Sequence, residues 1–202
     1  LTVPRGGEIS NYGRMSSGSR PDNSGVFGNY WRTYYRIIDR ANGIIKAAET
    51  INGMEEDRRT KVLAEAKFFR ANAVFTLYKL FNNIYVTTEP TTPENAMNIV
   101  LNKTPEADIY KLINDDLTYA IANLSMTTAD FGRITQATAR HVKAEVALWQ
   151  QNWAEAKLQS ETVLSSGAYS LVSSTAGVFA GDLKNSETLW ALQSKQGVDG
   201  AV

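Results

Sequence analysis

Apolar residues recur on a helical period in the stretch 62–81. Val62, Ala66, Phe69, Ala73, Leu77 and Phe81 follow one another at steps of four, three, four, four and four, which places them on one face of a helix. Small alanines alternate with large aromatic residues on this face. That alternation lets a neighbouring helix approach closely and leaves gaps that its side chains fill. The pattern therefore predicts a buried helix within a packed helical hairpin.

Further stretches with the same period predict helices from Tyr30 to about Asn52-Gly53, from Glu106 to Leu124, from Thr135 or Gln136 to Gln150, and over 153–165. Gly53 and Gly167 stand where helices commonly stop. Thr104-Pro105-Glu106 is a typical helix start, in which the threonine side chain is expected to cap. Trp149 continues the apolar stripe of its helix and Trp153 opens the next helix against it, so both are expected in the core.

Three parts of the chain lack this period. Residues 1–29 hold six of the 14 glycines and many polar residues, which is typical of an irregular loop. Residues 82–102 read as a long connection. Beyond Tyr169 the pattern weakens, with a short strand predicted over 187–193. The sequence thus predicts an all-α fold divided into a loop segment (1–29), a helical domain (30–168) and an irregular segment (169–202).

Composition excludes several classes of function. The 21 basic and 21 acidic residues cancel, so no net charge attracts nucleic acid, which is not an expected partner. The chain has no cysteine, which excludes disulfides, thiolate metal sites and cysteine nucleophiles. A single histidine, His141, leaves little for metal binding and is expected in a structural or surface role. No cofactor, metal or catalytic residue is predicted.

Two clusters of acidic residues are the nearest approach to catalytic chemistry. Glycoside hydrolysis needs two carboxylates that face each other across a cleft. Asp115-Asp116 and Glu55-Glu56-Asp57 are neighbours on helices, so their side chains point apart. We interpret both clusters as solvated acids on helix surfaces and predict that the protein is not an enzyme.

A helical-repeat motif lies in residues 142–156, where Trp153-Ala154-Glu155-Ala156 opens a second helix after a short turn. This arrangement is typical of a tetratricopeptide-type hairpin. Other sequence blocks flank it in a fixed order: Trp31-x-x-Tyr34-Tyr35-Arg36-Ile37-Ile38, Ala41-Asn42, Ala64-Glu65-Ala66-Lys67-Phe68-Phe69-Arg70-Ala71, Leu80-Phe81, Asp116-Leu117-x-x-Ala120-x-x-x-Leu124, Gly132-Arg133, Leu148-Trp149-Gln150-Gln151-Asn152-Trp153-Ala154-Glu155-Ala156, Ser166-Gly167-x-Tyr169-x-Leu171 and Ser186-Glu187-x-Leu189-Trp190.

In order and spacing, these blocks resemble the SusD/RagB family of glycan-binding outer-membrane lipoproteins. The resemblance implies tetratricopeptide-like hairpins in a right-handed superhelix that supports a larger irregular region carrying much of the sugar site. It also implies a surface-exposed, non-catalytic protein that captures a poly- or oligosaccharide and passes it to a SusC-like TonB-dependent transporter.

Two features depart from the family pattern. Family members begin with a lipidated cysteine, which is their only attachment to the membrane, whereas this chain has no cysteine. Family members are also considerably longer than this chain. We therefore expect the chain to be the N-terminal, scaffold-rich half of such a protein, leading into a truncated C-terminal region, or an unusually short relative.

Protein sugar sites combine aromatic faces with amide, carboxylate or arginine groups that bond hydroxyls. The N-terminal loop has this mixture. Trp190 is an aromatic residue with no clear place in the helical pattern, and its role is open between core packing and ligand contact. The candidate ligand-binding residues are Tyr12, Arg14, Asp22, Asn23, Asn29 and Trp190. The alternative interpretation of the loop is a solvated segment anchored by Tyr12 and Phe27.

A second function stays open at this point. A generic tetratricopeptide scaffold would bind a peptide or protein partner along a concave groove lined by asparagine and lysine. Asn42, Asn72 and Lys79 offer a few such residues, without a regular ladder.

Overall fold

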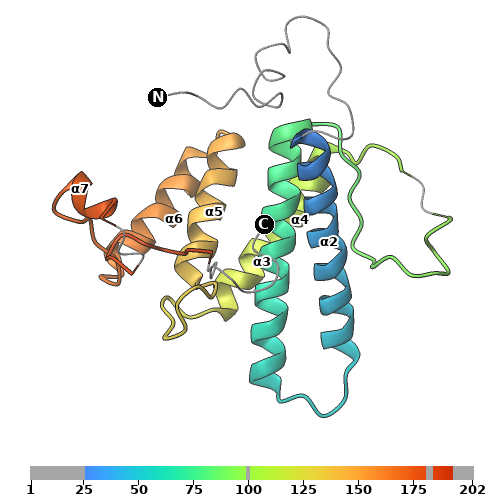
Figure 1. The fold of residues 1–202 in the computed structure, drawn as a ribbon, viewed down its shortest axis with the longest axis horizontal. Coiled ribbons are helices and arrows are strands. Elements are labelled where there is room, and N and C mark those ends of the chain that lie inside the picture. The colour runs from blue at the N-terminus through green and yellow to red at the C-terminus, as the bar shows by residue number, and fades with distance from the viewer. Residues whose placement is uncertain (1–25, 99–100, 181–183, 193–202) are drawn as a thin grey trace, which may run out of the picture.

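The computed structural model describes residues 26–98, 101–180 and 184–192, and this part of the chain is helical without any strand. The all-α prediction is confirmed. None of the described helices is long and apolar enough to cross a lipid bilayer. Figure 1 shows the helices in order: α2 (Val26–Thr50), α3 (Glu56–Phe81), α4 (Glu106–Asn123), α5 (Gln136–Trp149), α6 (Trp153–Ser165) and the short α7 (Thr175–Val178).

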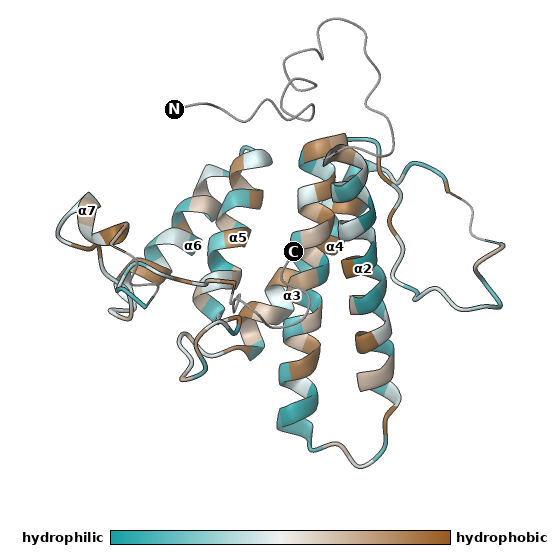
Figure 2. Cartoon of the chain, in the orientation of Figure 1, coloured by the Kyte–Doolittle hydropathy of each residue, from teal (hydrophilic) through white to brown (hydrophobic). Residues whose placement is uncertain are grey.

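Helix α3 is the centre of the fold, because it packs against both α2 and α4 and also contacts α5. Its predicted stripe is only part of its buried surface: Phe69 is 37% exposed, whereas Phe68 and Phe75 on another face are at most 1% exposed. A helix between two partners needs more than one apolar face. Figure 2 shows that α3 begins with polar residues and carries more apolar residues beyond its first turns.

The turn between α2 and α3 is closed by a side chain from the second helix. The guanidinium of Arg59 donates to the carbonyl oxygens of Ala48 and, at 2.9 Å, Ile51. These carbonyls lie in the last turn of α2 and just after it, where backbone acceptors lack helical partners and a positive charge is favourable. Gly53, with φ of +77°, makes the reversal that the predicted stop signal requires.

The helix starts follow the predictions with two exceptions. Helix α2 begins at Val26 rather than at Tyr30, so residues 26–29, predicted as the end of the irregular loop, are helical. Thr135 caps α5 by accepting from the backbone N–H of Thr138. Thr104 was expected to cap α4, which is wrong: its hydroxyl instead accepts from the backbone N–H of Val86 at 2.8 Å. The threonine therefore fixes the connection between α3 and α4 rather than the helix start.

Two other expectations are wrong. Trp149 and Trp153 are 55% and 63% exposed, because no described element covers this side of the α5–α6 hairpin; the indole of Trp149 touches only the edge of the core at Phe75, with centroids 6.3 Å apart. In the described residues 187–192 there is no strand, because no extended segment pairs with them.

A buried ion pair joins α3 to α4. Arg70 and Asp116 are 4% and 1% exposed, and the guanidinium donates to both carboxylate oxygens, from Nε to Oδ2 at 2.7 Å and from Nη2 to Oδ1 at 2.9 Å. Lys67 adds a longer contact of 3.4 Å to Oδ1. The interpretation of Asp115-Asp116 as two solvated acids is therefore wrong for Asp116, which faces α3, and right for the exposed Asp115.

Replacing Asp116 should destabilise the fold strongly. In Asp116→Asn the shape of the side chain is kept, but Arg70 becomes a buried charge without a counter-charge, which costs about 3 to 5 kcal/mol. The free energy of unfolding, measured by urea denaturation, should fall by that amount. The matched control is Asp115→Asn, which removes only a surface contact with Lys111 and should leave the midpoint nearly unchanged. Equal effects of the two substitutions would contradict the prediction.

Candidate functional site

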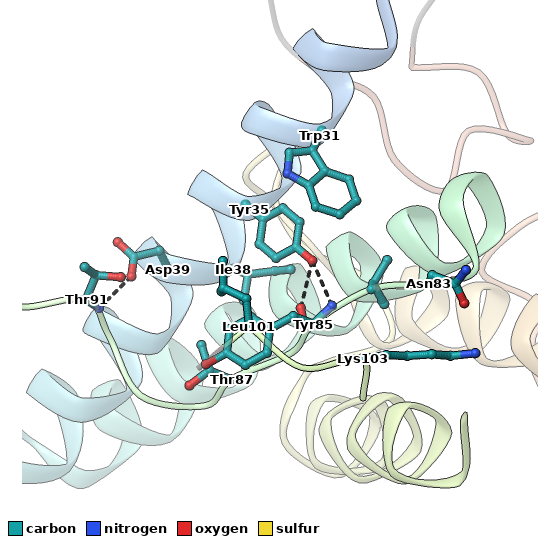
Figure 3. Close-up of a pocket in the computed structure, with 11 residues that line it drawn as sticks. Trp31, Tyr35, Ile38, Asp39, Asn83, Tyr85, Thr87, Thr91, Leu101 and Lys103 are labelled. Atoms are coloured by element: carbon teal, nitrogen blue, oxygen red, sulfur yellow. Dashed lines mark hydrogen bonds between the residues drawn. The ribbon is translucent and has the colours of Figure 1, made fainter. Parts of the chain in front are cut away.

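A cavity of about 550 Å³ lies between the first half of α2 and the connection 82–105 (Figure 3). Its size falls within the range of small-molecule sites. Aromatic side chains from both sides line it, together with a few polar groups: Trp31, Tyr35, Tyr85, Asp39, Asn83 and Lys103. The cavity thus combines apolar faces with hydrogen-bonding groups.

The most accessible aromatic face in the cavity is that of Trp31, which is 38% exposed. Its ring centroid lies 4.7 Å from that of Tyr35 and 5.0 Å from that of Phe81, the latter in an edge-on contact. Two ring contacts hold the indole in one orientation while leaving part of it open. A fixed, half-exposed indole is a suitable surface for stacking on the apolar face of a flat or ring-shaped ligand.

Polar side chains one helical turn apart on α2 hold the connection in place. We call them the α2 ladder: Tyr35, Asp39, Asn42 and Lys46. The hydroxyl of Tyr35 donates to the carbonyl oxygen of Tyr85 at 2.8 Å and accepts from the backbone N–H of the same residue at 3.1 Å. The Oδ1 atom of Asp39 accepts from the backbone N–H of Thr91 at 2.7 Å. Both bonds satisfy backbone groups of a segment that forms no regular structure.

The second half of the α2 ladder differs in burial. Asn42, 1% exposed, donates from Nδ2 to the carbonyl oxygens of Thr87 at 2.8 Å and Glu89 at 3.3 Å. Lys46 lies at the surface and forms an exposed ion pair with the carboxylate of Glu89 at 3.4 Å. An exposed ion pair adds little, so the connection is held by Tyr35, Asp39 and Asn42 rather than by Lys46.

The charges of the cavity are balanced and lie apart. Figure 3 shows Asp39 beside Thr91 at one end and Lys103 with Asn83 at the other. Burial raises the pKa of the Tyr35 phenol above its ordinary value of about 10, so this group remains a neutral hydroxyl at physiological pH. Opposite charges at the two ends favour a polar ligand without large net charge. In the described residues, histidines and acids form no group of three that could hold a metal ion.

The sequence-predicted site residues are only partly visible. Tyr12, Arg14, Asp22 and Asn23 lie outside the described residues. Asn29 is exposed in the first turns of α2, two residues before Trp31, and its Oδ1 accepts from Nη2 of Arg32 at 2.7 Å.

Trp190 packs on the core and does not line the cavity. It makes edge contacts with Phe68 and Phe69, each with centroids 6.2 Å apart, and its Nε1–H donates to the carbonyl of Gly132 at 2.9 Å. Trp190 thereby fastens the last described segment to α3.

Sequence reasoning did not single out Trp31, Asp39 or Lys103 as site residues. A signal for the α2 ladder does exist: its four polar residues follow one another at steps of four, three and four on a single helix face. A polar stripe beside an apolar stripe is ordinarily the solvent face of a helix, so the sequence alone does not distinguish the ladder from an exposed face.

A second cavity, of about 450 Å³, lies beside α6 and the segment after it. Apolar side chains such as Val163, Leu164 and Leu171 dominate its lining, and the hydroxyl of its Tyr169 donates to the carbonyl of Met126 at 3.2 Å. Because it offers no fixed, half-exposed indole, it is a weaker candidate than the cavity beneath Trp31.

Proteins of one family match most of the chain. A SusD-like family model, described as starch-binding and associating with the outer membrane, matches residues 12–148. The SusD-like protein P25 of Formosa agariphila is 29% identical over 173 residues, covering 84% of this chain and 32% of the relative. A SusD-like protein of Bacteroides ovatus is 31% identical over 125 residues, covering 61% of this chain and 22% of the relative.

Solved structures share the fold. A laminarin-binding SusD-like protein superposes with a TM-score of 0.73 at 26% identity, covering 80% of this chain and 36% of that one. A structure with a xylogluco-oligosaccharide gives a TM-score of 0.73 at 26% identity, covering 83% and 35%. A SusD-like protein from Bacteroides fragilis, at 22% identity and a TM-score of 0.75 over 85% and 34%, shows the fold alone.

These matches confirm the predicted resemblance and the tetratricopeptide-like helical fold. The chain spans about a third or less of the length of the curated relatives cited here. The match of the family model extends over more than half of the chain. This chain therefore belongs to the SusD-like family of starch-binding proteins that associate with the outer membrane.

Proposed function

We propose that this chain takes part in capturing an oligosaccharide or polysaccharide, and that the cavity between α2 and the connection 82–105 contacts the sugar. The observation that carries the proposal is the half-exposed indole of Trp31, which two neighbouring rings hold over the cavity. The apolar face of a pyranose ring stacks well on such a surface. Two solved relatives support this ligand class, one described as laminarin-binding and one determined with a xylogluco-oligosaccharide.

The polar groups around Trp31 suit a sugar. Asn83 supplies an amide, Asp39 an acceptor and Lys103 a donor, and together they can bond the hydroxyl groups at the edge of a sugar ring. Balanced charge in the lining favours a neutral glycan. The proposed event is reversible binding in which no covalent bond changes.

Handover and location are further parts of the proposal. We infer that the captured glycan passes to a SusC-like TonB-dependent transporter and that the protein works at the outer-membrane surface as a lipoprotein. The family description, which associates these proteins with the outer membrane, supports the location. The sequence resemblance supports the handover.

The N-terminal candidates also belong to the proposed site. Tyr12, Arg14, Asp22 and Asn23 precede Asn29 and Trp31 in the chain, and the family model already matches from residue 12. Their aromatic, amide and charged groups would extend the contact with sugar beyond the cavity.

Removal of the indole should weaken sugar binding. We expect Trp31→Ala to lower the affinity for the best ligand in a panel of neutral polysaccharides, including laminarin and xyloglucan, by about tenfold or more, because a stacking surface is lost. Isothermal titration calorimetry or affinity electrophoresis gives the measurement. Trp153→Ala is the matched control, since Trp153 is an exposed tryptophan far along the chain on α6. Equal loss in both variants, or none in Trp31→Ala, would contradict the role of the cavity.

Substitutions in the N-terminal segment test the wider site. Tyr12→Ala and Asn23→Ala should each weaken binding of the same glycan, by about three- to tenfold for a lost ring or hydrogen bond. The circular dichroism spectrum should not change. Unaltered affinity in both variants would restrict the site to the cavity. Failure of the unsubstituted chain to retain any polysaccharide would favour the peptide-binding scaffold instead.

A further inference from the structure

The outer wall of the cavity is a segment whose described residues, 82–98 and 101–105, form neither helix nor strand, so its path depends on what holds its backbone. Much of that support comes from the α2 ladder. Within the ladder Asn42 is the fully buried member, at 1% exposed, while Lys46 is exposed. A buried carboxamide must satisfy both of its ends, which makes Asn42 the most constrained of these contacts.

The orientation of the Asn42 amide is set from the core side. Its Oδ1 atom accepts from Nη1 of Arg70 at 2.9 Å, while its Nδ2 donates to the carbonyls of Thr87 and Glu89. Arginine has donors only, so a flipped amide would place its NH₂ group against the guanidinium and its oxygen against two carbonyls. Arg70 in turn is held by both oxygens of Asp116. The ion pair between α3 and α4 therefore fixes which way Asn42 points.

We infer that Asn42 is a positioning residue for the cavity: it transmits the fixed geometry of the Arg70–Asp116 pair to the backbone at Thr87 and Glu89 and so holds the wall that faces Trp31. Its effect on sugar affinity rests on the proposed function. Its hold on the connection does not, and the two are measured separately.

The helices do not need the Nδ2 atom of Asn42. Helix α2 packs through apolar residues such as Ile38, Ala41 and Ile45, which are 2%, 3% and 7% exposed. Arg70 and Asp116 bond each other directly. Loss of the Nδ2 donor should therefore act on the connection and leave the packing of α2 on α3 in place.

The substitution Asn42→Asp separates these roles. The introduced carboxylate has the same shape and still accepts from Arg70, but it places an oxygen against the carbonyls of Thr87 and Glu89. We expect amide hydrogen exchange to become about tenfold faster or more at Tyr85, Val86 and Thr91, whose N–H groups are bonded in the wild type. Exchange in the middle of α3 and α4 should stay unchanged. Affinity for the glycan that the wild type binds should fall by about tenfold or more.

The matched control is Lys46→Ala, which removes only the exposed pair with Glu89. It should change neither exchange nor affinity. Faster exchange throughout the helices of Asn42→Asp would show a general structural role and overturn the inference, as would unchanged exchange in the connection. Faster exchange in the connection of Asn42→Asp together with unchanged affinity for the glycan would also overturn the inference.

A measurement on the wild type keeps the inference testable if the variant fails to fold. Slow exchange at Tyr85, Val86 and Thr91 in the free protein supports a connection that is held before any sugar binds, and fast exchange there overturns it. If the wild type binds no glycan, the proposed function fails, and the exchange data alone decide whether Asn42 holds the connection.

Discussion

A buried guanidinium organises this structure. Arg70 lies almost out of contact with water, so its donors must be met by protein groups, and the carboxylate of Asp116 and the carboxamide of Asn42 meet them from two different helices. The cost of leaving any of these groups unpaired in a region of low dielectric is high. These bonds fix both the spacing between helices α2, α3 and α4 and the rotation of each helix about its axis. Apolar packing alone would define the rotation less strictly.

The cavity follows from this arrangement. With α2 held in one rotation, its Trp31, Tyr35 and Asp39 all face the connection, and the backbone of the connection has defined partners at Tyr85 and Thr91. The same helix thus provides an aromatic surface, a polar attachment and a buried core face along its length. A binding surface built on a rigid helix keeps its geometry better than one built wholly from loops.

Local periodicity was sufficient to predict the helices, because apolar spacing along α3, α4 and α5 reflects contacts with helices close in sequence. It failed where burial depends on the partner. Asp115 and Asp116 look alike in sequence, yet only Asp116 faces α3, and Trp149 continues an apolar stripe whose end no described element covers. The candidate cavity could not be predicted for a similar reason: it forms when the connection returns to α2 across about fifty residues, and Trp31 on its own reads as one more core residue.

The way in which the connection is attached bears on how such a site diversifies. The three inner members of the α2 ladder bond backbone N–H and carbonyl groups of the connection, which every residue type except proline provides in full. Some side chains of the connection also help to hold it in place, such as Thr104, whose hydroxyl accepts from the backbone N–H of Val86, while others such as Asn83 line the cavity. A lining residue such as Asn83 can change, and with it the polar groups that the cavity presents, while the bonds from α2 to the backbone remain. Part of the lining of the cavity can therefore vary without disturbing the scaffold, because the inner bonds from α2 go to backbone atoms of the connection and not to its side chains.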